Sequence, residues 1–172
     1  MANQSIIIVA LSFFNHEEDV AYEPTRFKQF DKAFVEWTYG GAGVRFKGDK
    51  AVYGLAGKWS IATNFQWEED IARFCKQAKA LGISHIEGEY FDYELGLDFA
   101  TRGVFEINTS NSEVTYHDTT ELYDSLLDFA KAYGYVPQDF VLDDEADDFD
   151  EQIDTLTDAI DIGTAKTLGV EL

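Results

Sequence analysis

The segment from Val141 to Gly163 combines two patterns that strongly restrict its structure. It contains ten carboxylates and no lysine or arginine, yet apolar residues recur in it at helical spacing. At about 100° per residue, one narrow sector of a helix would carry the apolar side chains of Phe149, Ile153, Leu156 and Ile160. The opposite side would carry a row of carboxylates: Asp147, Glu151, Asp154, Asp158 and Asp161. We therefore predict an amphipathic helix over about 146–161, docked through its apolar stripe.

The acidity of the chain is concentrated toward this segment. Residues 1–60 contain seven acidic and seven basic residues, whereas residues 101–172 contain eighteen acidic and three basic residues. The last 72 residues therefore hold −15 of the total formal charge of −20. A general adaptation to salt or solubility would spread the charge evenly, so the asymmetry indicates one surface with a function.

Composition nevertheless predicts a folded chain. Hydrophobic residues make up 45% and aromatic residues 15%, whereas disordered acidic chains are poor in both. A single cysteine, Cys75, excludes an internal disulfide and fits a reducing compartment. No basic segment precedes the apolar run 6–14, and no apolar stretch approaches the ~20 residues of a membrane span. We expect a soluble protein of the bacterial cytoplasm that binds neither membranes nor nucleic acid directly, because phosphates repel its charge.

Local patterns predict a mixture of strands and helices. The expected strands are 5–14, a hairpin over 43–55 around Gly48-Asp49, the alternating segment 85–94, and a second hairpin of 103–107 with 113–117. The expected helices are Pro24-Thr25 to about Tyr39, 65–81 with an Asn64 cap, Thr119 or Thr120 to Tyr133, and the acidic helix. This order predicts an α+β fold with a largely antiparallel sheet and about four helices. We divide it into a core domain, 1–140, and an acidic helical segment packed on it, 141–172.

No catalytic or metal-binding signature is complete. Gly57-Lys58 is followed by Trp59, so it is no phosphate-binding loop, and the stretch beginning at Asp143 has Asp148 where a calcium loop needs glycine. His16 near three acids lacks the spacing of a metal site. The carboxylates of the strand 85–94 lack the lysine of a nuclease strand: Glu87, Glu89, Asp92 and Glu94. We expect no enzyme activity, no metal and no cofactor.

The candidate functional residues are therefore carboxylates that would bind a partner. On the predicted acidic helix and just before it they are Asp143, Asp144, Asp147, Asp148, Glu151, Asp154, Asp158 and Asp161. The predicted third helix would add a second row with Asp118, Glu121, Asp124 and Asp128. Carboxylates one helical turn apart are spaced much like the phosphates of one DNA strand. This pattern favours a mimic of the nucleic-acid backbone, and an ordinary solvated helix face stays open as the alternative.

Two fragments resemble the ArdA family of antirestriction proteins, which are elongated acidic DNA mimics of conjugative elements and phages. The first is IIIVALSFFN (6–15), which matches the character of the strand that opens those proteins. The second is Phe91-Asp92-Tyr93-Glu94, similar to their DYEG motif, although here Leu95 separates Glu94 from Gly96. The resemblance covers about a quarter of the chain. It implies inhibition of type I restriction-modification enzymes by occupation of their DNA groove.

Three function classes follow from these patterns. The first is a non-enzymatic inhibitor from a phage or mobile element, whose partner is a basic nucleic-acid-binding protein or complex of the host, such as a restriction enzyme or a CRISPR effector. The second is an immunity protein or antitoxin that neutralises a basic nuclease toxin. The third is a virion protein. Whether the protein forms a homodimer stays open.

Overall fold

The protein is an α+β structure built on one antiparallel sheet. The computed structural model describes residues 5–37, 41–47, 50–57, 68–94, 99–117 and 121–169, to which all structural statements below refer. The strands are β1 (Ser5–Asn15), β2 (Glu18–Val20), β3 (Gly41–Lys47), β4 (Lys50–Gly57), β5 (His85–Glu94), β6 (Phe99–Asn108), β7 (Glu113–Tyr116) and β8 (Glu121–Tyr123). The helices are α1 (Lys28–Trp37), α3 (Glu68–Ala80), α4 (Leu126–Ala132) and α5 (Phe149–Thr167). The predicted fold class is confirmed.

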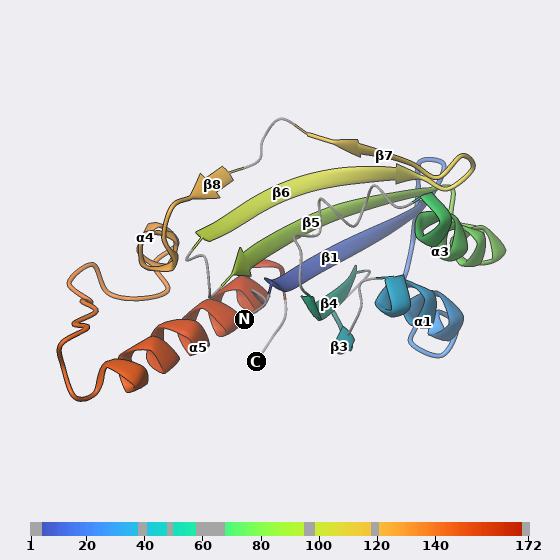
Figure 1. Cartoon of the computed structure of the whole chain (residues 1–172). Helices are drawn as coiled ribbons and strands as arrows, with labels where there is room; N and C mark the ends of the chain where they lie inside the picture. Colours follow the sequence, from blue (N-terminus) through green and yellow to red (C-terminus); the bar gives the residue numbers. More distant parts are fainter. Residues whose placement is uncertain are drawn as a thin grey trace.

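The sheet has the strand order β3-β4-β1-β5-β6-β7, with β2 added beside β1 and β8 beside β6. Every neighbouring pair is antiparallel. The two long strands β5 and β6 and the central strand β1 run side by side through the middle of the molecule (Figure 1). The predicted strands 5–14 and 85–94 and both predicted hairpins are confirmed, whereas the turn residues Gly48 and Asp49 lie outside the described residues.

Side chains of β1 alternate between the two faces of the sheet, and both faces are apolar along this strand. Ile7, Val9 and Leu11 point to the face covered by α1 and α3, which we call the helix-pair face. Ile6, Ile8 and Ala10 point to the opposite face, where α5 packs, which we call the α5 face. A central strand that is buried on both sides needs a continuous apolar run, as found at the start of this chain.

The core of the helix-pair face is largely aromatic. Phe30 and Phe34 of α1 meet Phe74 of α3 edge-on, with ring centroids 6.1 and 5.5 Å apart. Phe27 lies just before α1, and Phe13 of β1 contacts it at 5.0 Å. Such tilted and edge-on contacts are the favoured geometry of aromatic pairs. The predicted apolar faces of both helices are confirmed, including the core position of the buried Cys75. The side chain of Trp37 and the predicted cap Asn64 lie outside the described residues.

The core of the α5 face covers only one half of that face. Phe91, Tyr93 and Ala100 are buried there by α4 and α5, which contribute Phe129 and Ile160. Farther along β5, the same face carries His85 and Glu87, with side chains 32% and 49% exposed. None of the described elements covers this second part, which we call the open half of the α5 face.

One predicted helix is wrong. The sequence predicts a single helix from Thr119 or Thr120 to Tyr133, but the structure has the strand β8 at Glu121–Tyr123 and the short helix α4 at Leu126–Ala132. Ser125 separates them, because its side-chain oxygen accepts a hydrogen bond from the backbone N–H of Asp128 and starts the helix there. The alternation of Glu121, Leu122 and Tyr123 then lets β8 pair with the edge of β6. The strand β2 was not predicted.

The last helix is confirmed as acidic and amphipathic, but it is longer than predicted. It runs past Gly163 to Thr167. A Cβ atom at Gly163 would lie 2.3 Å from the ring carbon Cδ1 of Tyr135, so the ring occupies the space that a side chain would need. Gly163 therefore permits close packing in the helix and does not end it.

A similar close approach makes Gly88 of β5 sensitive to substitution. A Cβ at this position would lie 2.1 Å from the Cζ atom of Phe105, a ring that is fully buried. Gly88→Ala is expected to lower the free energy of unfolding by about 1–3 kcal/mol, because the core must move to accept the methyl group. Gly54→Ala on β4 is the matched control, since its nearest contact would be at 3.8 Å from Ile8. Urea denaturation of both variants measures the effect, and equal losses would contradict it.

Candidate acidic interaction surface

The C-terminal part of the chain presents a continuous group of exposed carboxylates. Leu156, Ile160 and Thr164 are the buried residues of α5, and they place this helix against the core of the α5 face. The acidic residues that this docking leaves exposed are Asp139, Asp143, Asp144, Glu145, Asp147, Asp148, Asp150, Glu151, Asp154 and Asp158. Between Lys131 and Lys166 the sequence has no lysine or arginine. We call these ten residues the acidic surface.

Hydrogen bonds hold the loop before α5 to the helix. The backbone N–H of Asp143 donates to the side-chain oxygen of Gln152 at 2.8 Å, and the Gln152 amide donates to Asp148 at 2.9 Å. Within the loop, the N–H of Glu145 donates to the Asp143 carboxylate at 3.1 Å. One glutamine thus ties both ends of the acidic loop to the first turns of the helix. The loop carboxylates consequently have defined positions relative to those on the helix.

The first half of α5 extends beyond the core that holds the second half. Phe149 and Ile153, predicted as part of the docking stripe, are only partly buried, and full burial begins at Leu156. Figure 1 shows the helix leaving the sheet toward the loop at its N-terminal end. Carboxylates around this end therefore face solvent on several sides of the helix, and the acidic surface forms a projection.

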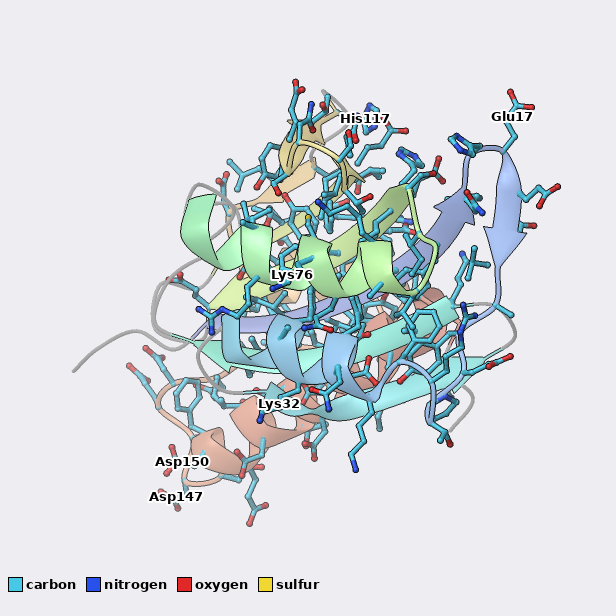
Figure 2. The ribbon with its side chains drawn as sticks, turned by 90° about the vertical axis from the view of Figure 1, so that its right-hand side faces the viewer. Glu17, Lys32, Lys76, His117, Asp147 and Asp150 are labelled. Atoms are coloured by element: carbon cyan, nitrogen blue, oxygen red, sulfur yellow. The ribbon has the colours of Figure 1, made fainter. Side chains whose placement is uncertain are left out.

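Apart from Lys166 at the C-terminal end of α5, exposed basic residues cluster on the helix pair. The exposed basic residues on and just before α1 and α3 are Arg26, Lys28, Lys32, Arg73, Lys76 and Lys79. Figure 2, which looks onto these two helices, shows Lys32 and Lys76 toward the viewer and Asp147 and Asp150 on the far side. In Figure 1 the acidic loop and the helix pair likewise lie at opposite ends of the molecule. The protein is therefore electrically polar as well as acidic.

Asp161 differs from the other carboxylates predicted on the outward row. It is partly buried, and it accepts a hydrogen bond from the hydroxyl of Tyr93 on β5. Burial raises the pKa of its carboxyl group above the ordinary value. The structure places this residue at the contact between α5 and the sheet, away from the exposed carboxylates Glu151, Asp154 and Asp158 of the same helix. Asp147, predicted as the first member of the helical row, is exposed but lies in the turn before α5, because the helix begins at Phe149.

The predicted second row does not form one line. Asp118 lies outside the described residues, and Glu121 lies on β8 rather than on a helix. Glu121 accepts hydrogen bonds from Tyr133 at 2.6 Å and Tyr123 at 2.9 Å, and these bonds lower the pKa of its carboxyl group. Asp124 and Asp128 are exposed, but a strand and a helix cap separate them from the helical spacing on which the row was based.

Arg102 of β6 lies on the α5 face of the sheet, and it is already engaged. Its guanidinium forms an ion pair with Glu89 and donates to the Tyr133 hydroxyl at 3.0 Å. It also lies over the rings of Phe91 and Tyr133, 5.2 and 5.6 Å from their centroids. Burial, with a further contribution from Glu121, raises the pKa of Tyr133 to about 12, so this hydroxyl stays protonated and can donate. Arg102 thus fixes the loop after α4 on the sheet and does not neutralise the acidic surface.

Two other polar clusters were not predicted from the sequence. Asp31 on α1 accepts hydrogen bonds from the hydroxyls of Tyr22 and Tyr53 at 2.5 and 2.6 Å, and burial raises the pKa of its carboxyl group. His85, Glu87 and Glu106 meet on the open half of the α5 face. The acids grouped on the strand 85–94 are separated by alternation: Glu87 and Glu89 lie on the α5 face, whereas Asp92 and Glu94 are buried on the other. A shallow cavity of about 540 Å³ opens beside His85.

No family model, curated protein or solved structure matches this chain. The resemblance to the ArdA family therefore stays a prediction from the two quoted fragments. In the structure these fragments are neighbours, because Ile6 pairs with Tyr93 and Ile8 with Phe91 across β1 and β5. Among the helices that the structure describes, none has the length and apolar character that a membrane span requires.

The burial of Asp161 predicts an unusual pH dependence of stability. Its pKa is higher in the folded than in the unfolded protein, so the folded state binds more protons between these two values. This contribution to the free energy of unfolding is complete below the unfolded pKa of about 3.9 and is lost as pH rises through the folded pKa. Asp161→Asn cannot ionise, so its stability relative to the natural protein should increase from about pH 4 to pH 7.

Urea denaturation at a series of pH values measures this difference. Asp158→Asn is the matched control, because it removes an exposed carboxylate from the same helix. The control should show a much weaker pH-dependent difference from the natural protein. Identical pH profiles for Asp161→Asn and the natural protein would show that Asp161 ionises as it does in the unfolded chain.

Proposed function

We propose that the protein is a non-enzymatic inhibitor whose acidic surface occupies the nucleic-acid-binding groove of a host defence enzyme. The observation that carries this proposal is the group of ten exposed carboxylates, without an interspersed lysine or arginine, on an ordered projecting element. A groove that binds nucleic acid is lined with lysine and arginine, so it is complementary to such a surface in charge.

The spacing of the carboxylates supports mimicry of a phosphate backbone. Asp147, Glu151, Asp154 and Asp158 follow one another at intervals of three or four residues. Glu151, Asp154 and Asp158 lie on α5, where a rise of about 1.5 Å per residue separates their positions by about 4.5–6 Å along the helix axis, and Asp147 lies in the turn two residues before the helix begins. Along the duplex axis, neighbouring phosphates of one DNA strand are about 3.4 Å apart. Because the strand also winds around that axis, the distance between neighbouring phosphates through space is about 6–7 Å. A row of basic groups that contacts successive phosphates can therefore contact successive carboxylates.

The energetic disadvantage of this arrangement also favours a role in binding. Carboxylates one turn apart on a helix repel each other by a few tenths of a kcal/mol per pair. Lysine at alternate positions would remove that repulsion, and an exposed helix face tolerates lysine freely. The acidic surface is instead uniform over Asp139–Asp158. When cationic groups of a partner neutralise the carboxylates, the repulsion between them disappears, and this favours the bound state.

Inhibition would be competitive with DNA or RNA. The carboxylates form charge-assisted hydrogen bonds with lysine and arginine of the groove, and the negative field of the molecule accelerates the approach. Both effects weaken as salt screens the charges. Type I restriction enzymes and RNA-guided nucleases contain grooves of this kind, and the resemblance of residues 6–15 and 91–94 to the ArdA family favours the former.

Neutralising the exposed row tests the proposal. The variant Asp147→Asn, Glu151→Gln, Asp154→Asn, Asp158→Asn keeps the side-chain shapes and removes four charges. We expect its inhibition constant against a purified type I restriction enzyme to rise by about tenfold or more, because each exposed ion pair contributes about 0.2–1 kcal/mol. Displacement of a fluorescent DNA duplex from the enzyme, measured over a range of salt concentrations, gives the constant and its salt dependence. An RNA-guided nuclease is assayed in parallel.

A matched control removes four exposed charges far from this surface. Glu17→Gln, Glu18→Gln, Asp19→Asn, Glu23→Gln changes the net charge equally, on β2 and in the segments on either side of it; Glu17 is labelled in Figure 2. This variant should inhibit like the natural protein. Equal inhibition by both variants, or inhibition that excess DNA does not relieve, would refute mimicry at the acidic surface. Tight binding to a nuclease toxin alone would identify an immunity protein, and assembly into particles would identify a virion protein.

A further inference from the structure

Two histidines and two glutamates converge on the open half of the α5 face, far along the sheet from the acidic surface. His85 and Glu87 belong to β5, Glu106 belongs to β6, and His117 directly follows β7. The His85 Nε2 atom lies 3.4 Å from Glu87 Oε1 and 3.8 Å from Glu106 Oε1. The His117 Nε2 atom lies 3.7 Å from the other oxygen of Glu106. Residues of β5 and β6 thus direct three ligand atoms toward a common region, and Glu106 links this group to His117 through its second oxygen.

The sheet register places the two glutamates of this group side by side. Glu87 and Glu106 are direct cross-strand partners, so their carboxylates leave the same face at neighbouring positions. Like charges at such positions destabilise a sheet. The ion pair of Glu89 with Arg102 lies at the border of the open half, and no lysine or arginine is within ion-pair distance of Glu87 or Glu106 among the described side chains. With neutral imidazoles the four residues carry a charge of −2, which a divalent ion balances.

The donor atoms have the spacing of a transition-metal site. The ligand atoms of His85, Glu87 and Glu106 all lie within 4.8 Å of one another. In a tetrahedral zinc site with bonds of about 2.0–2.1 Å, ligand atoms are separated by about 3.3 Å. The observed separations of 3.4 and 3.8 Å from His85 require only small side-chain rotations to reach that value. Two imidazoles and two carboxylates also suit Zn²⁺ and its neighbours, whereas Mg²⁺ and Ca²⁺ prefer sets made of oxygen alone.

The scaffold around these side chains is already fixed. β5 and β6 pair continuously from His85 opposite Asn108 to Glu94 opposite Phe99. The ring of Phe14 on β1 packs against the His85 imidazole, with centroids 5.7 Å apart. The backbone N–H of His117 donates to Val104 of β6 at 3.1 Å and so holds the end of β7 in place. Because sheets supply precise positions, little ordering is needed before an ion can bind.

We propose that His85, Glu87 and Glu106 bind a Zn²⁺-class divalent ion and that His117 completes the site. The ion ties the short strand β7, which pairs only with β6 among the described strands, to the long strands β5 and β6. It also removes the repulsion between Glu87 and Glu106. The site is independent of the acidic surface and of the function proposed for it, since it shares no residue with that surface.

Zinc titration of the metal-free protein tests the site. The protein is treated with a chelator, and ZnCl₂ is added in excess Mg²⁺, which occupies sites made of carboxylates alone. Isothermal titration calorimetry should then show one zinc ion bound per chain. Zinc should also raise the melting temperature, since an ion that binds only the folded state stabilises it. In ¹⁵N spectra of the histidine side chains, the Nε2 signals of His85 and His117 should shift on zinc addition, whereas that of His16 should not.

Two variants and two controls make the result specific. His85→Phe keeps an aromatic ring against Phe14, and Glu106→Gln removes one of the two opposed charges, so both are expected to fold. Each should weaken zinc affinity by about tenfold or more and abolish the zinc-dependent rise in melting temperature. The controls are His16→Asn on the β1–β2 turn and Glu113→Gln on β7, which should bind zinc like the natural protein. Unchanged affinity in His85→Phe and Glu106→Gln, or equal shifts of all three histidine signals, would overturn the proposal.

Discussion

The pairing of β1 with β4 on one side and β5 on the other fixes the layers of the molecule. β1 lies in the interior of the sheet, and its apolar residues alternate between two cores. Ile7 and Val9 join the helix-pair core, while Ile6 and Ile8 join the α5 core. A register slip of one residue would turn the side chains that belong to one core toward the other core. The close fit of Gly88 against Phe105 and of Gly103 against Tyr90 shows that the side-chain layers are matched to one register.

The same register determines where the polar clusters lie. On the α5 face, β5 and β6 carry apolar residues at the end where Phe91 is opposite Arg102, and carboxylates at the end where Glu87 is opposite Glu106. The helices α4 and α5 cover only the apolar end, because only there can Leu156 and Ile160 be buried. Arg102 marks the border, with an aromatic contact on one side and an ion pair on the other. The acidic surface and the histidine cluster are thus separated by the length of the sheet.

Patterns that depend on neighbouring residues could be predicted from the sequence, and patterns that depend on tertiary contacts could not. The apolar run of β1 and the helical spacing in α5 are local signals, and both elements exist, although α5 begins at Phe149 and extends to Thr167. The segment Glu121–Tyr123 has helix-compatible composition, but an available edge of β6 makes it a strand. Asp161 shares the helical phase of exposed carboxylates, yet the hydroxyl of Tyr93, far away in sequence, meets it. The histidine cluster likewise joins residues of β5 and β6 with His117 after β7, so no spacing in the sequence could reveal it.

The position of the apolar contacts along α5 links its stability to its charge. Leu156, Ile160 and Thr164 hold its second half, whereas the first half has no fully buried residue and carries Asp150, Glu151 and Asp154. Repulsion among these carboxylates therefore acts where tertiary contacts oppose it least. Cations that bind along this half remove the repulsion and so stabilise the helix. Formation of the helix in turn strengthens cation binding by the same free energy. A groove lined with basic residues would therefore bind the projection most tightly in its fully helical form, which the Gln152 hydrogen bonds to Asp143 and Asp148 already favour.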